Sequence, residues 1–176
     1  MSVSLEPFDE ARHSVEVITE LLHKAYARLQ AMGFNYTATN QDASVTLKRL
    51  KAGMAFVALD QQEIVGTITY YEAPYSSVGT WYQRQDVGIF GQFAVKPECQ
   101  GQGIGSRLLE TVEALARSRG KTELALDTSE GATHLRQFYE RHGYRDVEFL
   151  QWPGKTYRSV VMTKRLAESS GKKNQE

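Results

Sequence analysis

A glycine-rich turn between an apolar segment and an amphipathic helix is the feature that most constrains this chain. Glycines alternate at Gly101, Gly103 and Gly105, after the segment GIFGQFAVKPECQ and before a run with one apolar helical face. The first N–H groups of a helix lack intrahelical partners and lie at the positive end of its dipole. The sequence therefore predicts a strand-to-helix turn that binds an anionic group.

The spacing of these glycines distinguishes between the known phosphate-binding motifs. A Walker P-loop needs a Gly-Lys-Ser/Thr closure, which this segment does not contain. The dinucleotide fingerprint needs glycine or alanine where Ser106 stands, and KPECQ intervenes between the predicted strand and Gly101. A further interpretation is that the glycines only shape a tight turn and bind nothing. Alternate glycines beside Gln100 exceed that need, however, and favour a nest of N–H groups for a pyrophosphate.

Composition narrows the class of partner. The chain has 176 residues, with 21 basic and 21 acidic side chains, which fits one domain and argues against a nucleic-acid or membrane binder. Cys99 is the only cysteine, so an intrachain disulfide and a thiolate metal cluster are excluded. The N-terminus is acidic where a signal peptide would be apolar. We therefore expect a soluble cytoplasmic protein with a small-molecule partner.

Hydrophobic periodicity predicts alternating strands and helices. Strands are expected over 3–8, 54–60, 63–73, 89–95, 123–127, 144–152 and 155–166, and helices over 18–33, 41–53, 104–120 and 132–143. The unit from Ile89 to Asp127 is strand, helix, strand, so the sheet must contain a parallel pair and be mixed. We expect an α/β domain over 1–166, a long mobile loop over 74–86 and a disordered tail over 167–176.

The segment from Gln100 to Gly105 resembles the signature of the GNAT superfamily of acyl-CoA-dependent N-acyltransferases, Q/R-x-x-G-x-G/A at a strand-to-helix turn. The likeness includes FYERHGY, residues 138–144, and spans roughly residues 64–166. It implies a single-domain, twisted, mixed and mostly antiparallel sheet with helices on both faces and one central parallel βαβ unit. Many members have an asparagine seven residues before the tyrosine, where this chain has Ala132.

The same resemblance implies that acetyl-CoA is the co-substrate and that no metal takes part. The backbone of residues 93–95 would pair with the pantetheine arm, while the N–H groups of residues 102–106 would hold the pyrophosphate. The predicted cofactor-binding residues are Phe93, Ala94, Val95, Gln100, Gly101, Gln102, Gly103, Ile104, Gly105 and Ser106. The acetyl group would pass to a primary amine of a small molecule or peptide.

Tyr139 is the candidate catalytic acid that the resemblance implies. A phenol with a pKa of about 10 can protonate a thiolate with a pKa of roughly 8.5 at a cost of about 2 kcal/mol. The alternative is that Leu135, Phe138 and Tyr139, at helical spacing, form a buried face in which the hydroxyl donates to a carbonyl.

The general base is not identified by the sequence. Asp127, Glu72 and Asp86 each follow or precede a predicted strand and are candidates. An aromatic cluster could wall the amine site or serve core or dimer packing; its members are Tyr70, Tyr71, Tyr75, Trp81 and Tyr82. The histidines lack metal-ligand context, and His142 is interpreted as an ordinary helix residue.

Three other functions stay open at this point. The chain could be a non-catalytic acyl-CoA-binding module, a protein N-terminal or lysine acetyltransferase, or a nucleotide-dependent oxidoreductase. A homodimer is compatible with the sequence.

Overall fold

The computed structural model describes residues 2–167, which form one seven-stranded sheet in the order β1-β2-β3-β4-β5-β7-β6. The strands are β1 (Val3–Pro7), β2 (Met54–Asp60), β3 (Glu63–Tyr71), β4 (Val87–Val95), β5 (Glu123–Ser129), β6 (Arg145–Leu150) and β7 (Ser159–Arg165). The helices are α1 (Val15–Ala31), α2 (Ala43–Lys51), α3 (Ile104–Ser118) and α4 (Thr133–Arg141). The predicted tail lies outside the described residues, apart from Ala167.

The strand pairing confirms the predicted mixed sheet. Only β4 and β5 pair in parallel, through the crossover helix α3, and the other neighbouring strands are antiparallel. Local chemistry places the elements as expected. Ser14 and Asp42 cap α1 and α2 by accepting from backbone N–H groups, and Gly33, with φ of 90°, follows α1.

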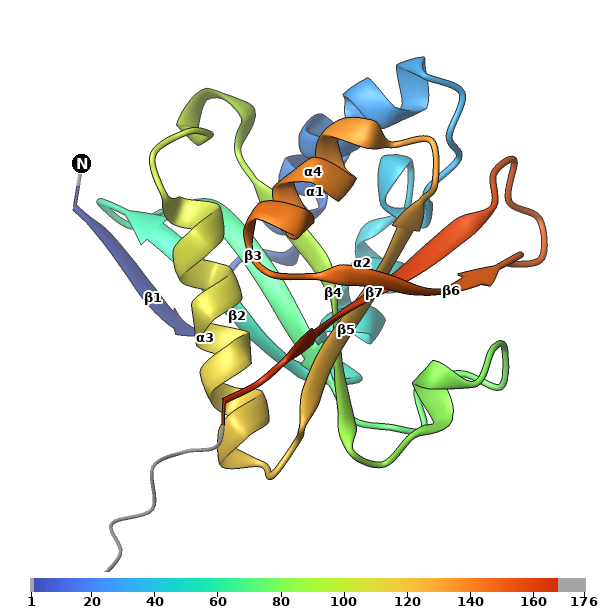
Figure 1. Cartoon of the computed structure of the whole chain (residues 1–176). Coiled ribbons are helices and arrows are strands. Elements are labelled where there is room, and N and C mark those ends of the chain that lie inside the picture. Colours follow the sequence, from blue (N-terminus) through green and yellow to red (C-terminus); the bar gives the residue numbers. More distant parts are fainter. Residues whose placement is uncertain (1, 168–176) are drawn as a thin grey trace, which may run out of the picture.

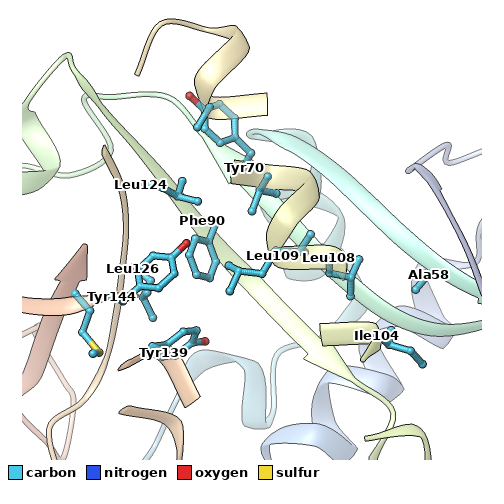
Figure 2. Close-up of a cluster of buried hydrophobic side chains, with 14 of the residues drawn as sticks. Ala58, Tyr70, Phe90, Ile104, Leu108, Leu109, Leu124, Leu126, Tyr139 and Tyr144 are labelled. Carbon is cyan, nitrogen blue, oxygen red and sulfur yellow. The ribbon is translucent and has the colours of Figure 1, made fainter. Parts of the chain in front are cut away.

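Helices cover both faces of the sheet (Figure 1). On one face, α3 and α4 pack over a core that includes Ile68, Phe90, Leu108, Leu124 and Tyr139 (Figure 2). On the other face, α1 and α2 pack over a second core, formed with side chains of β2, β3 and β4. The sheet therefore has a layer of helices on each of its two faces.

The sheet opens between β4 and β5. Their pairing ends at Ile89 and Ala125, and the two strands then diverge toward the end of the sheet where α1 and α4 lie (Figure 1). A bulge at Gln92, with φ of 49°, shifts the register between β4 and β3. Bulges bend strands and redirect side chains, often near functional sites. The edge of β4 that faces β5 has no strand partner from Phe90 to Val95 among the described residues. The carbonyls of Phe93 and Val95 accept from Tyr26 and Gln100, and the remaining peptide groups of this edge are open to a ligand.

Residues 74–86, the predicted mobile loop, are held to the sheet by several contacts. Glu148 of β6 accepts from the backbone N–H groups of Thr80 and Trp81. The backbone N–H of Tyr75 donates to the carbonyl of Tyr82 at 3.0 Å, and Tyr82 itself is buried. The segment contains a short 3-10 helix, Trp81–Gln83. Its aromatic side chains thus have defined places beside β5.

Candidate active site

The glycine turn presents free backbone N–H groups at the start of α3. Gly101 and Gly103 have φ of 79° and 82°, a region that side-chain-bearing residues rarely adopt. A Cβ on either would meet nothing within 4 Å, so backbone conformation, not crowding, requires glycine there. Gly103 occupies the N-cap position and no side chain caps the helix. An uncapped helix start of this kind has backbone donors that an anion could accept from, so the predicted anion site stays a prediction.

A cavity of about 580 Å³ lies against this turn. It is bordered by α1, the end of β4, the start of α3 and by α4. Ten of the eleven predicted site residues line it, namely Phe93, Ala94, Val95, Gln100, Gly101, Gly103, Ile104, Gly105, Ser106 and Tyr139. Gln102 does not line it. The predicted residues are thus brought together around one space of the size that ligands occupy.

Two residues close the wall between the turn and β4. A Cβ on Gly105 would make ordinary van der Waals contacts of 3.5 to 3.7 Å with Phe93, Val95 and Phe138, so α3 starts close to β4 and α4 at this residue. The side-chain amide of Gln100 donates to the carbonyl of Val95 at 3.1 Å. Gln100 therefore ties the turn to β4 in the structure.

Tyr139 has a packed ring and a free hydroxyl. Its side chain lies against Phe90, Phe93 and Tyr144, and the residue is 7% exposed. Figure 2 shows the hydroxyl turned away from Tyr144. Within residues 2–167 that hydroxyl has no hydrogen-bond partner, so the structure does not support the alternative in which it donates to a core carbonyl. Burial raises the pKa of Tyr139 well above its ordinary value, which keeps its proton in place at neutral pH.

Other residues of the cavity were not predicted from the sequence. The hydroxyl of Tyr26, on α1, donates to the carbonyl of Phe93 at 3.1 Å. His142 follows α4 and lies 2.9 Å from Ser106 Oγ through Nε2, while its Nδ1 is 2.7 Å from the carbonyl of Phe138. His142 is therefore a cavity residue, and its interpretation as an ordinary helix residue was wrong. Its place within FYERHGY could have indicated this.

The three candidate bases lie in different places. Glu72 pairs with Lys121 at 2.8 Å and with Arg119, just beyond the end of α3. Asp86 pairs with Arg84 at 2.7 Å. Since α3 has 15 residues, Glu72 lies roughly 20 Å from the glycine turn. Neither carboxylate is placed to receive a proton at the cavity.

Asp127 stands where the sheet opens, two residues beyond the last pairing of β5 with β4. Its Oδ1 accepts from the Tyr82 hydroxyl at 2.6 Å, and its Oδ2 accepts from Trp152 Nε1 at 2.9 Å. Burial raises the pKa of Asp127, and those two hydrogen bonds oppose the rise. Asp127 does not itself line the cavity; its position at the opening between β4 and β5 is what brings it near the free end of β4.

The aromatic cluster expected from the sequence is divided in the structure. Tyr70 belongs to the core under α3, while Tyr71 and Tyr82 belong to a third buried cluster, formed with side chains of β4, β5, β6 and β7. Trp81 lies under the guanidinium of Arg84, whose centre is 4.3 Å from the ring centroid. Tyr75 is partly exposed. Of the five, Tyr82 contacts a candidate catalytic group directly.

Within the described range, no group of three or more His, Cys, Asp or Glu residues has a metal-binding arrangement. Over the same part of the chain, every helix is too short or too polar to cross a bilayer.

Known proteins agree with this geometry. A model of the acetyltransferase (GNAT) family matches residues 17–144. The chain belongs to this family. It is similar to the S-(2-succino)cysteine N-acetyltransferase of Bacillus subtilis (strain 168), with 29% identity over 160 residues that cover 86% of this chain and 90% of the relative. The predicted family is thus confirmed. The protein is an N-acetyltransferase, and acetyl-CoA is the donor of the acetyl group in this family.

Solved structures confirm the GNAT fold. The PaiA N-acetyltransferase of Thermoplasma acidophilum, in complex with coenzyme A, has a TM-score of 0.71 at 15% identity, covering 94% of this chain and 99% of its own. A GNAT acetyltransferase of Elizabethkingia anophelis with acetyl-CoA bound has a TM-score of 0.65 at 19% identity, covering 93% and 98%. These likenesses show the fold; the first of these structures holds coenzyme A and the second holds acetyl-CoA.

Proposed function

We propose that this GNAT enzyme acetylates the primary amine of a small molecule of the amino-acid type. The observation that carries the proposal is one cavity in which an uncapped helix start, an unpaired strand edge and a free tyrosine hydroxyl meet. The N–H groups at the start of α3 would hold the pyrophosphate of acetyl-CoA. The free edge of β4, residues 93–95, would pair with the pantetheine arm.

The reaction requires one bond to form and one to break. The amine nitrogen attacks the thioester carbon, the N–C bond forms, and the C–S bond breaks with its electron pair passing to sulfur. A backbone N–H on the open edge of β4 polarises the thioester oxygen. The hydroxyl of Tyr139 gives its proton to the departing thiolate, and its burial ensures that this proton is present at neutral pH.

We assign Asp127 as the group that receives the proton of the amine. An alkyl ammonium with a pKa of about 10.4 must become neutral before it attacks, so a nearby acceptor lowers the barrier. Glu72 and Asp86 are ion-paired elsewhere, whereas Asp127 lies at the opening between β4 and β5. Its raised pKa makes it a stronger base than an exposed carboxylate.

The amino-acid type of acceptor follows from the similarity to the Bacillus subtilis protein. That relative is named for S-(2-succino)cysteine, an amino acid with extra carboxylates, and the two chains match over most of their lengths. Other amines, including peptide N-termini, are the competing acceptors.

An acceptor panel tests this function. The protein would be incubated with acetyl-CoA and, separately, S-(2-succino)cysteine, L-methionine, spermidine and a short peptide with a free N-terminus, while free thiol release is followed. We expect an amino acid to exceed spermidine and the peptide by at least about tenfold in kcat/KM. Faster reaction of the peptide would assign a peptide acetyltransferase. Tight binding of acetyl-CoA without thiol release on any amine would instead support the non-catalytic module.

A further inference from the structure

Arg49 of α2 is a partly buried cation held by two neutral amides. Its Nη1 donates to Gln41 Oε1 at 2.9 Å. When the Gln92 amide turns its oxygen toward the guanidinium, that oxygen lies 2.9 Å from Nη1 and 3.2 Å from both Nη2 and Nε. In the part of the chain that the structure describes, Arg49 forms no ion pair with a carboxylate within 4.0 Å. Its charge is therefore not neutralised by the fold.

The two amides are fixed before any ligand arrives. Gln41 and Gln92 are only 5% and 3% exposed, and Gln41 Nε2 also donates to Thr46 Oγ1 at 2.8 Å. Gln92 is the residue of the β4 bulge, and its left-handed backbone goes with a side chain that reaches Arg49 of α2. Gln92 therefore combines a strained backbone conformation with a buried side chain that contacts Arg49. This combination indicates that the fold holds the guanidinium of Arg49 in one place.

Groups from several elements surround the guanidinium. Burial raises the pKa of Tyr26, Tyr75 and Tyr157, and the charge of Arg49 acts on all three in the opposite direction. Burial lowers the pKa of Lys155, and repulsion from Arg49 adds to that effect. These side chains come from α1, from residues 74–86 and from the segment between β6 and β7. Ring contacts join these segments around α2: the hydroxyl of Tyr71 donates to the carbonyl of Arg49 at 2.8 Å, the Tyr71 and Tyr75 rings lie 5.1 Å apart, and Tyr26 and Tyr157 both pack on Tyr36. These tyrosines are the walls of the space beside Arg49.

Asp127 borders the same group of rings with the opposite charge, because its Oδ1 accepts from Tyr82, whose ring lies 5.2 Å from that of Tyr75. Arg49 acts on the pKa of Asp127, yet the two form no ion pair. The hydroxyl of Tyr26 bonds to the carbonyl of Phe93, so this space adjoins the edge of β4 on which acetyl-CoA is proposed to lie. A cation and an anion that face one space without pairing are complementary to a molecule that carries both an amine and a carboxylate.

We propose that Arg49 binds a carboxylate of the acceptor, so that the acceptor amine is delivered to Asp127 with its carboxylate held on α2. This inference rests on the proposed function, since it names how that acceptor is recognised. A guanidinium binds a carboxylate through two parallel N–H···O bonds, a geometry that lysine and neutral residues do not reproduce. Amines without a neighbouring carboxylate are then poor acceptors.

Product binding tests the inference without turnover. N-acetyl-L-methionine and N-acetyl-L-methioninamide would each be titrated into the protein saturated with coenzyme A, with binding followed by calorimetry. The unbranched methionine side chain suits a space walled by aromatic rings. We expect the carboxylate to bind at least about tenfold more tightly than the amide, because hydrogen bonds to a charged group are stronger than neutral ones.

Arg49→Gln is the test variant, since glutamine can still bond to the Gln41 and Gln92 amides. It should bring the ratio of the two affinities close to one. Arg49→Lys should retain part of the preference through its charge. Lys48→Met is the matched control, because Lys48 is exposed on the same helix, and it should keep the full preference. Melting temperatures of all variants would be compared to detect unfolding.

The outcomes separate this inference from the proposed function. Equal affinity for acid and amide in the wild type, no binding of either, or an Arg49→Gln variant that weakens both alike would overturn the role of Arg49. A wild-type preference that Arg49→Gln removes would establish the role, even if every amine in the panel failed to release thiol. That combination would overturn the proposed acetyl transfer and leave carboxylate binding in place.

Discussion

The two sides of the opening between β4 and β5 are built in different ways. The co-substrate side uses a nearly continuous stretch, residues 93–106, and its polar groups are mostly backbone N–H donors at an uncapped helix. The amine side gathers charged and phenolic side chains from α1, α2, residues 74–86, β5 and the β6–β7 segment. Backbone donors suit a ligand that is the same in every family member. Side chains from many segments suit an acceptor that differs between members.

This difference yields predictions that treat the two sides separately. Changes on the co-substrate side should alter acetyl-CoA binding or the chemical step for every amine. Changes on the amine side should alter acceptor choice or proton removal while acetyl-CoA binding is kept.

Tyr139→Phe should give the largest effect, because it removes the acid and keeps the ring. The hydroxyl makes no hydrogen bond within residues 2–167, so the packing against Phe90 and Phe93 should persist and the melting temperature should hardly change. A positioned acid contributes roughly 100-fold to 10,000-fold, so kcat should fall by that order while acetyl-CoA affinity is retained. A variant that melts early and turns over at the wild-type rate would remove Tyr139 from the mechanism.

Asp127→Asn should lower kcat/KM by about 100-fold at pH 7, since a general base is lost. The defect should shrink as the pH approaches about 10, because more of the amine is then already neutral. Tyr82→Phe is the control: it removes one hydrogen bond to Asp127 and leaves the carboxylate. It should cost about 1 kcal/mol of stability with a small effect on rate. A pH-independent defect in Asp127→Asn would indicate a structural role instead.

The sequence predicted the strand, the turn and the helix of the proposed co-substrate side because their signal is local. The glycine spacing and the apolar runs on either side are contiguous, and positive φ at Gly101 and Gly103 is a property of residue type. The hairpin of β2 and β3 was predicted for the same reason, with Gln61 and Gln62 in the left-handed region at its turn. Residue types within a short stretch of sequence are enough to predict the glycine turn and this hairpin, without any tertiary contact.

The proposed amine side was predicted only in part: the sequence offered Asp127 among three bases and an aromatic cluster, but no local pattern marks Arg49. Arg49 reads as a polar residue on a short helix, and Gln92 reads as an ordinary strand residue until the bulge is known. Their contact depends on the register of β3 against β4 and on where α2 packs. The choice of Asp127 over Glu72 and Asp86 likewise required the point at which β4 and β5 separate.

Gly103→Val should lower acetyl-CoA affinity at least about tenfold, because a branched side chain would occupy the space of the pyrophosphate and oppose the positive φ. Gly120→Val is a matched control at the other end of α3. It has φ of 75°, and a Cβ there also meets nothing within 4 Å. Both variants should lose similar stability, and only Gly103→Val should weaken binding in calorimetric titrations. Equal affinities would contradict the anion site at the turn.

Asp86→Asn should give the smallest effect and no loss of acetyl transfer, because Asp86 lies at the paired end of the strands. The hydrogen bonds from Arg84 and then Thr122 lower the pKa of Asp86 to about 2. Its side chain is 46% exposed, so solvent screening limits its contribution to less than about 1 kcal/mol. A folded pKa below the unfolded value means that folding favours the ionised form. The contribution is therefore complete above about pH 4 and is lost as the pH falls toward 2.

Urea denaturation of the wild type and Asp86→Asn at pH 7 and pH 3 would measure this difference. The stability gap should be present at pH 7 and smaller at pH 3, with kcat/KM for the amine unchanged at neutral pH. A fall in kcat/KM comparable to that of Asp127→Asn would mean that the paired end of β4 takes part in proton removal. The distinction between the open and paired ends of these strands would then be wrong, since an ion-paired carboxylate far from the glycine turn would be serving the reaction.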